Sequence, residues 1–256
     1  MTVTYPDQLK AAIRLADRTD PDDNIAKLLR ETFDAEADYL ASLIRDNPHT
    51  TKDTKNNATT VLDVGCGNGR TIRNVCKCLE RAPIKLEYIG LDKDTDLLPA
   101  EMTQVTHKDP THIAILYIHG NFFETSHRFL RNYNHTYTSY NTIGMVEEYK
   151  RPEFVQKMAD CTKTEGKIVN ITWKMDEPTR EFLDEYYRRI HFSVLIPHHS
   201  DTLSTYILAK PETGEEVRID MVSTDQLIYL HERAGIKENK IIPVEPLWVA
   251  VEGTKR

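Results

Sequence analysis

Apolar positions near the start of the chain recur at steps of three and four residues. Within residues 7–46 this spacing places Phe33 and Tyr39 among regularly spaced Leu and Ile residues. Such spacing is typical of amphipathic helices. Residues 47–59 are polar, with Ala58 as their one apolar side chain, which is typical of a linker. We therefore predict a helical N-terminal cap over residues 1–50, followed by a domain over residues 58–256.

Beyond residue 58, short apolar runs alternate with longer amphipathic or polar segments. The apolar runs predict strands at Thr60–Val64, Lys85–Leu91, Ile113–Ile118, Thr136–Asn141 and Lys167–Trp173. The segments between them predict helices at Arg70–Arg81, within Asp94–His107 and at Pro152–Thr164, with a helix or turn at Phe122–Asn132. Strict alternation of strand and helix indicates an α/β fold, with a mostly parallel sheet and helices on both faces.

The last third of the chain departs from this alternation. It predicts a helix, a hairpin, a second helix and two strands, at Thr179–Ile190, Leu203–Ala209 with Glu216–Val222, Ser223–Gly235, Lys240–Val244 and Leu247–Val251. Ser223 and Gln226 form a capping box at the start of the second helix, and Gly235 marks its end. Residues 174–222 therefore lie between the fifth predicted strand and the last helix, and contain the first helix and the hairpin.

Composition and charge narrow the class of protein. The net charge of −7 argues against a nucleic-acid backbone as the main partner, although a local basic patch stays open. No apolar run approaches the ~18–20 residues of a membrane span, and the N-terminus lacks the pattern of a secretory signal. The four cysteines contain no CxxC pair, which favours reduced thiols over a zinc site. We expect a cytoplasmic protein with no membrane partner and no metal.

The stretch VLDVGCGNG places three glycines at alternate positions directly after a predicted strand. In open parallel sheets, ligands bind beyond the carboxyl ends of the strands, where glycine lets a ligand approach the backbone closely. Asp92 directly follows the next predicted strand, 23 residues after Gly69, and an acid there can bind both hydroxyls of a ribose. The GNFFE stretch, Gly120–Glu124, follows the third strand and can present polar groups to an adenine edge.

These three elements together resemble the class I S-adenosylmethionine-dependent methyltransferases, and the resemblance covers residues 58–173 and extends to the C-terminal helix and two strands. The resemblance implies a Rossmann-like sheet of seven strands, S-adenosylmethionine as cofactor and S-adenosylhomocysteine as product. It implies that Asp63, Gly65, Cys66 and Gly67 hold the methionine portion, Asp92 the ribose, and Lys93, Asn121 and Phe122 the adenine. The family more often has Asp at the position of Asn121, and an Asn oxygen can also accept from the exocyclic amine. As alternatives, Asp92 caps a helix and Asn121 makes a turn.

After the fourth predicted strand, the run YNTIG occupies the place of motif IV in this family. It resembles small-molecule N-methyltransferases, including the glycine and sarcosine type. The D/N-P-P-Y form, which is typical of enzymes that methylate exocyclic amines of nucleic-acid bases, is absent. We therefore predict Tyr140 and Asn141 as catalytic residues that position the acceptor. The alternative for both residues is packing at a strand end followed by a turn.

In this family, an insertion at the place of residues 174–222 commonly covers the acceptor pocket. The resemblance therefore implies that the helix and hairpin of this segment form a lid, and that the last two strands join the main sheet. Within and beside this segment we predict Trp173, Tyr186 and His198 as substrate-binding residues, because aromatic and cationic side chains suit a small acceptor. The alternative for the aromatic side chains is core packing. His198 and His199 also admit a base or a metal pair, but the sequence offers no evident third ligand.

The sequence therefore predicts a methyltransferase that acts on a small amine-bearing acceptor by in-line transfer. A protein or RNA methyltransferase is the second interpretation. A non-catalytic protein that binds S-adenosylmethionine is the third, and a dinucleotide oxidoreductase is disfavoured by the glycine spacing. The acceptor itself and the choice between monomer and homodimer stay open.

Overall fold

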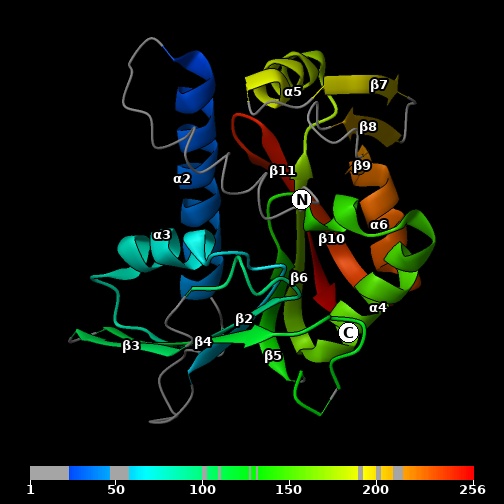
Figure 1. The fold of residues 1–256 in the computed structure, drawn as a ribbon. Coiled ribbons are helices and arrows are strands. Elements are labelled where there is room, and N and C mark those ends of the chain that lie inside the picture. The colour runs from blue at the N-terminus through cyan, green and yellow to red at the C-terminus, as the bar shows by residue number, and fades with distance from the viewer. Residues whose placement is uncertain are drawn as a thin grey trace.

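Figure 1 shows the fold in a computed structural model, which describes residues 23–46, 58–99, 103–108, 111–126, 128–130, 132–189, 193–199, 203–209 and 216–256. The predicted helix before residue 23 and most of the predicted linker, residues 47–57, lie outside these ranges.

The centre of the molecule is an eight-stranded sheet in the order β10-β11-β6-β5-β1-β2-β4-β3. Its strands are β1 (Thr59–Val64), β2 (Lys85–Asp92), β3 (Thr103–Lys108), β4 (Thr111–His119), β5 (Tyr133–Thr138), β6 (Thr162–Trp173), β10 (Ile236–Val244) and β11 (Trp248–Lys255). Strands β3 and β11 run antiparallel to their neighbours, and the remaining pairs are parallel. The predicted α/β fold with a mostly parallel sheet is confirmed, with β3 added to the seven expected strands.

Helices cover both faces of this sheet (Figure 1). The helices α2 (Asn24–Arg45) and α3 (Arg70–Leu79) pack on one face, and α4 (Arg151–Cys161) and α6 (Thr224–Arg233) pack on the other. Successive residues of β1 show the alternation, since Val61 belongs to the first buried cluster and Leu62 to the second. A parallel strand buried on both faces is rich in apolar residues, here Val61, Leu62 and Val64, which made β1 recognisable in the sequence.

Helix α2 forms a layer of the domain. Asp23 caps its start, because the Asp23 carboxylate accepts a hydrogen bond from the backbone N–H of Ala26 at 3.1 Å. The Tyr39 hydroxyl donates to Glu252 Oε2 of β11 at 3.0 Å, across 213 residues of sequence. The buried apolar side chains of α2 belong to the same cluster as those of the sheet. That residues 1–50 form a cap, distinct from a domain over residues 58–256, stays a prediction.

A second, smaller sheet lies beyond the carboxyl end of β6 (Figure 1). It contains β7 (Ser193–His199), β8 (Leu203–Ala209) and β9 (Glu216–Val222), and α5 (Glu177–Arg189) connects it to β6. The predicted helix and hairpin of the insertion are confirmed, and β7 was not predicted. The insertion is therefore a small α/β layer placed over one end of the main sheet.

Two further predictions were wrong in detail. The segment Asp94–His107 does not contain the expected helix in its described part; instead Thr103–Lys108 forms β3, which pairs antiparallel with β4 at the sheet edge. The strand predicted to reach Asn141 ends at Thr138, because Tyr140 and Asn141 have φ angles of 47° and 59°. These left-handed conformations turn the chain out of the sheet.

Candidate functional site

The strand order reverses at β1, whose neighbours are β2 on one side and β5 on the other. Such a reversal opens a crevice at the carboxyl ends of the two strands. The glycine turn lies there, and Gly65, Gly67 and Gly69 have φ angles of 79°, 54° and 72°. A Cβ on Gly69 would lie 2.2 Å from the Tyr117 hydroxyl, and one on Gly65 would lie 2.6 Å from Thr142. The turn therefore requires glycine at both positions.

Asp92 fastens this turn to β2. Its Oδ2 accepts a hydrogen bond from the backbone N–H of Gly67 at 2.8 Å, and its Oδ1 accepts from that of Asp94 at 2.9 Å. Burial raises the pKa of this carboxyl above its ordinary value, while the two hydrogen bonds act in the opposite direction. Asp92 thus stabilises the glycine turn and also lies at the edge of a cleft.

This cleft has a volume of about 380 Å³ and lies at the carboxyl ends of β1, β2 and β4. Its size is within the range that is usual for small-molecule sites. Five residues predicted to bind a nucleotide-like ligand line it, namely Gly65, Asp92, Lys93, Asn121 and Phe122. Apolar side chains, among them Leu91 and Phe154, form much of the remaining wall. The structure therefore brings together the groups predicted for a ribose and an adenine.

The other three predicted residues, Asp63, Cys66 and Gly67, do not line the cleft. Asp63 lies fully buried on β1, where the Tyr88 hydroxyl donates a hydrogen bond to its Oδ2. Burial raises the pKa of this carboxyl to about 7. The Cys66 thiol packs against Gly90 of β2, and burial raises its pKa. Asp63 and Cys66 support the turn from beneath.

The loop after β4 is held by a lysine that the sequence analysis missed. Lys157 of α4 is 7% exposed, and its Nζ donates to the carbonyl oxygens of Phe123 at 3.0 Å and Thr125 at 2.7 Å. Within the loop, the Asn121 side chain accepts from the backbone N–H of Phe123 at 3.0 Å. Sequence gives no sign of this arrangement, because the partners of Lys157 are backbone atoms more than thirty residues away.

Replacement of Lys157 by methionine is expected to lower the free energy of unfolding by about 1–3 kcal/mol, because two carbonyl oxygens lose their buried donor. Urea denaturation of the variant and the wild type measures this difference. Lys77→Met, at an exposed lysine of α3, is the matched control and is expected to change stability by less than about 0.5 kcal/mol. Equal losses in the two variants would show that Lys157 does not hold the loop.

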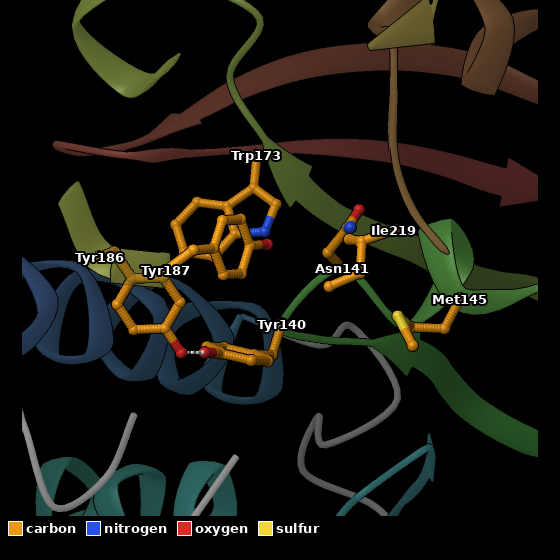
Figure 2. Close-up of a pocket in the computed structure, with 7 residues that line it drawn as sticks. All are labelled: Tyr140, Asn141, Met145, Trp173, Tyr186, Tyr187 and Ile219. Carbon is orange, nitrogen blue, oxygen red and sulfur yellow. Dashed lines mark hydrogen bonds between the residues drawn. The ribbon is translucent and has the colours of Figure 1, made fainter. Parts of the chain in front are cut away.

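A second, much smaller cavity lies at the ends of β5 and β6 (Figure 2). Its volume is about 10 Å³, which is room for one water molecule. The Tyr140 and Tyr186 hydroxyls are hydrogen-bonded across it at 2.8 Å. The residues that line it are Tyr140, Asn141, Met145, Trp173, Tyr186, Tyr187 and Ile219. Four of the predicted catalytic and substrate-binding residues therefore meet at one place; the fifth, His198, lies on β7, and its side chain is outside the described part of the structure.

The turn at Tyr140 and Asn141 is held by contacts from distant parts of the chain. The Asn141 amide donates to the backbone oxygen of Asp220 at 2.8 Å and accepts from the Thr172 hydroxyl at 2.8 Å. A Cβ on Gly144 would lie 2.0 Å from that same Asp220 oxygen. Consecutive non-glycine residues with left-handed conformations are strained and are frequent at functional sites. Strands β6 and β9 therefore hold the bend that points Tyr140 into the small cavity.

Asp220 in turn is fixed by an ion pair with Arg151, and both side chains are almost fully buried. The Asp220 carboxylate also accepts from the Thr205 hydroxyl at 2.7 Å and from Arg218 Nε at 3.0 Å. Burial alone would raise the pKa of Asp220, but the hydrogen bonds from Arg218, Thr205 and Arg151 outweigh it and lower the pKa. This cluster docks the smaller sheet onto the start of α4.

The described ranges bear on metal binding and on membrane insertion. In those ranges, no three His, Cys, Asp or Glu side chains gather as they would around a metal ion. None of the helices described there combines the length and apolar character needed to cross a membrane.

No protein-family model matches the sequence, and no curated protein matches it. Solved structures do match. Human N-acetylserotonin methyltransferase, in complex with S-adenosylmethionine, is 11% identical with a TM-score of 0.55, over 97% of this chain and 56% of its own. This chain thus spans little more than half of that enzyme.

Two other solved structures match over most of their own length. The glycopeptide N-methyltransferase MtfA, complexed with S-adenosylmethionine, is 12% identical with a TM-score of 0.52, over 87% of this chain and 94% of its own. The PH0226 protein of Pyrococcus horikoshii is 13% identical with a TM-score of 0.54, over 78% of this chain and 84% of its own. Identities this low bear on architecture alone. The chain therefore has the Rossmann-like fold that S-adenosylmethionine-dependent methyltransferases use.

Proposed function

We propose that this protein is an S-adenosylmethionine-dependent methyltransferase that acts on a small-molecule acceptor at an amine nitrogen. The observation that carries the proposal is the cleft at the strand reversal, where Gly65, Asp92 and Asn121 lie together. The small aromatic cavity beside it supports an acceptor of limited size. The similarity in fold to methyltransferases solved with this cofactor adds support.

The residues of the cleft suit the cofactor. Leu91, Phe122 and Phe154 offer an apolar surface for an adenine, and the Asp92 carboxylate lies at the edge where a ribose diol would bind. The glycine turn leaves no Cβ between the strand end and a ligand. The size of the cleft and the chemistry of its lining therefore match the nucleoside part of S-adenosylmethionine.

Buried charged groups that complement the methionine part of the cofactor lie close to the turn. Helix α3 begins at Arg70, directly after Gly69, and Arg70 Nη2 pairs with Glu36 Oε2 at 2.9 Å. Among the described residues, Arg70 Nη1, Glu36 Oε1 and Asp63 Oδ1 are buried polar atoms without a hydrogen-bond partner. A guanidinium donor and carboxylate acceptors complement the carboxylate and ammonium of an amino acid. Buried polar atoms of this kind favour a ligand with both charges.

When bound, S-adenosylmethionine supplies a methyl group on a sulfonium, which already contains its leaving group. The protein then has to position the acceptor and exclude water. We propose that Tyr140 and Asn141 position the acceptor, and that Trp173, Tyr186 and His198 contribute to its pocket. Burial raises the pKa of Tyr140 to about 12, so this hydroxyl is neutral at pH 7 and acts through hydrogen bonds.

Titration calorimetry with S-adenosylhomocysteine tests the proposal. The wild type is expected to bind with a dissociation constant in the micromolar range, and Asp92→Ala is expected to bind at least about tenfold more weakly, because a hydrogen-bonded charge is lost. Asp96→Ala, at an exposed aspartate four residues away, is the matched control and should bind like the wild type. Circular dichroism establishes that each variant is folded. A folded wild type that does not bind S-adenosylhomocysteine would overturn the proposal.

A further inference from the structure

Met145 lies where the two cavities adjoin. It ends the short helix η2 (Thr142–Met145), which follows the strained turn after β5. Its side chain lines both the nucleotide-sized cleft and the small aromatic cavity. It also lines an open groove of about 750 Å³ beside Tyr149 and Arg218. Figure 2 shows the Met145 side chain at one end of the aromatic cavity, opposite Tyr186.

The chemistry of the aromatic cavity limits what can enter it. The residues that line it contribute four aromatic rings, Ile219, the Met145 thioether and the Asn141 amide, and none of these is ionised at pH 7. The Arg70 guanidinium is not part of this lining; it lies 5.8 Å from the Tyr140 ring centroid and is paired with Glu36. A charged substituent buried here would lose its hydration without gaining an ion pair.

We propose that Met145 closes the passage between the aromatic cavity and the cleft, and that the acceptor carries its amine on an uncharged, apolar group that fills the aromatic cavity. This inference rests on the proposed function, since it places the acceptor next to the methyl donor. It argues against amino acids as acceptors, because their carboxylate has no partner in the cavity lining.

Methionine suits this task physically. Its side chain is unbranched, with three rotatable bonds, so it vacates one position and fills another at little cost. The cavity is only large enough for about one water molecule, so an acceptor has to displace a side chain. The tyrosines and Trp173 are fixed by ring contacts at 5.1–6.0 Å and by the Tyr140–Tyr186 hydrogen bond. Met145, at the end of a single turn of helix, is the lining side chain with the most freedom to move.

The two tryptophans of the chain provide the readout. Trp173 lines the cavity, and the Trp248 ring lies 5.6 Å from the rings of both Trp173 and Tyr140. The two indole N–H signals in a ¹H–¹⁵N spectrum therefore report what enters. Aniline is the probe, because it is an uncharged flat amine at neutral pH. 4-Aminobenzoate is its matched partner, since it differs only by a carboxylate.

Both probes are titrated into the full chain with saturating S-adenosylhomocysteine, for the wild type, Met145→Ala and Met145→Leu. We expect Met145→Ala to bind aniline at least about tenfold more tightly than the wild type, because the passage is open and an apolar space is available. We expect Met145→Leu to bind it like the wild type. 4-Aminobenzoate should shift neither indole signal in any variant.

Equal aniline affinity in Met145→Ala and the wild type, or 4-aminobenzoate binding as tight as aniline, would overturn the inference. Met158→Ala, which removes a buried methionine from the opposite face of the sheet, controls for general loosening and should not tighten aniline binding. S-adenosylhomocysteine is titrated separately into each variant. Failure of the wild type in that titration overturns the proposed function, whereas failure in the aniline titration alone overturns the role of Met145.

Discussion

Replacement of Arg151 by methionine is expected to lower the free energy of unfolding by about 3–5 kcal/mol, because it leaves a buried carboxylate without its main counterion. The Arg151 side chain is 1% exposed and that of Asp220 is 4% exposed. Arg151 Nε also donates to the backbone oxygen of Val146 at 3.0 Å, so the variant loses a second contact. Methionine preserves much of the side-chain volume, so the loss reflects charge and hydrogen bonding.

The matched control is Arg218→Met, which removes the other arginine bound to Asp220. The Arg218 side chain is 56% exposed, so its loss is expected to cost about 1 kcal/mol or less. Urea denaturation measures both variants. A loss for Arg151→Met no larger than that for Arg218→Met would show that the buried pair does not hold the smaller sheet in place.

The second large effect is a dependence of stability on pH that arises from Asp63. Burial raises the pKa of this carboxyl from 3.8 to about 7 in the folded protein. A raised folded-state pKa contributes stability that is fully present below the unfolded pKa and is lost as the pH rises through the folded pKa. A change from 3.8 to about 7 corresponds to about 4 kcal/mol, lost between about pH 4 and pH 7.

Asp63→Asn removes this titration. We expect the difference in unfolding free energy between variant and wild type to change by about 4 kcal/mol in favour of the variant between pH 4 and pH 7, and to level off above about pH 8. Urea denaturation at a series of pH values gives this difference, and other titrating groups cancel from it. Asp96→Asn, at an exposed aspartate, should track the wild type. A constant difference between Asp63→Asn and the wild type across this range would contradict the assigned pKa.

The sequence predicted those parts of the fold in which local pattern and tertiary role agree. Strand β1 is buried on both faces, so its second half carries the apolar residues Val61, Leu62 and Val64, and glycine follows. Strand β3 was missed, because TQVTHK contains a single apolar residue and the preceding segment resembles a short helix. A strand at a sheet edge is specified largely by backbone pairing with its neighbour, here β4, which leaves little trace in side-chain pattern.

In the site, too, features set by local pattern were predicted and features set by distant contacts were not. Asp92 and Asn121 line the cleft, because the ends of parallel strands meet at one edge of the sheet. That they bind a cofactor stays a prediction. The bend at Tyr140 was predicted as strand, since it depends on contacts of Asn141 with Thr172 and Asp220 that lie far away in sequence. Lys157 and Met145 were missed for a similar reason: their importance comes from what they touch in the folded chain.

The position of β11 delays completion of the fold until the end of synthesis. Strand β11 lies between β6 and β10, and its Glu252 accepts the hydrogen bond from Tyr39 of α2. A ribosome releases α2 long before it has synthesised residues 248–255, so β6 lacks its outer neighbour and α2 lacks part of its packing surface until then. Nascent chains of this protein should therefore stay sensitive to protease, and dependent on chaperones that shield apolar surface, until β11 has emerged.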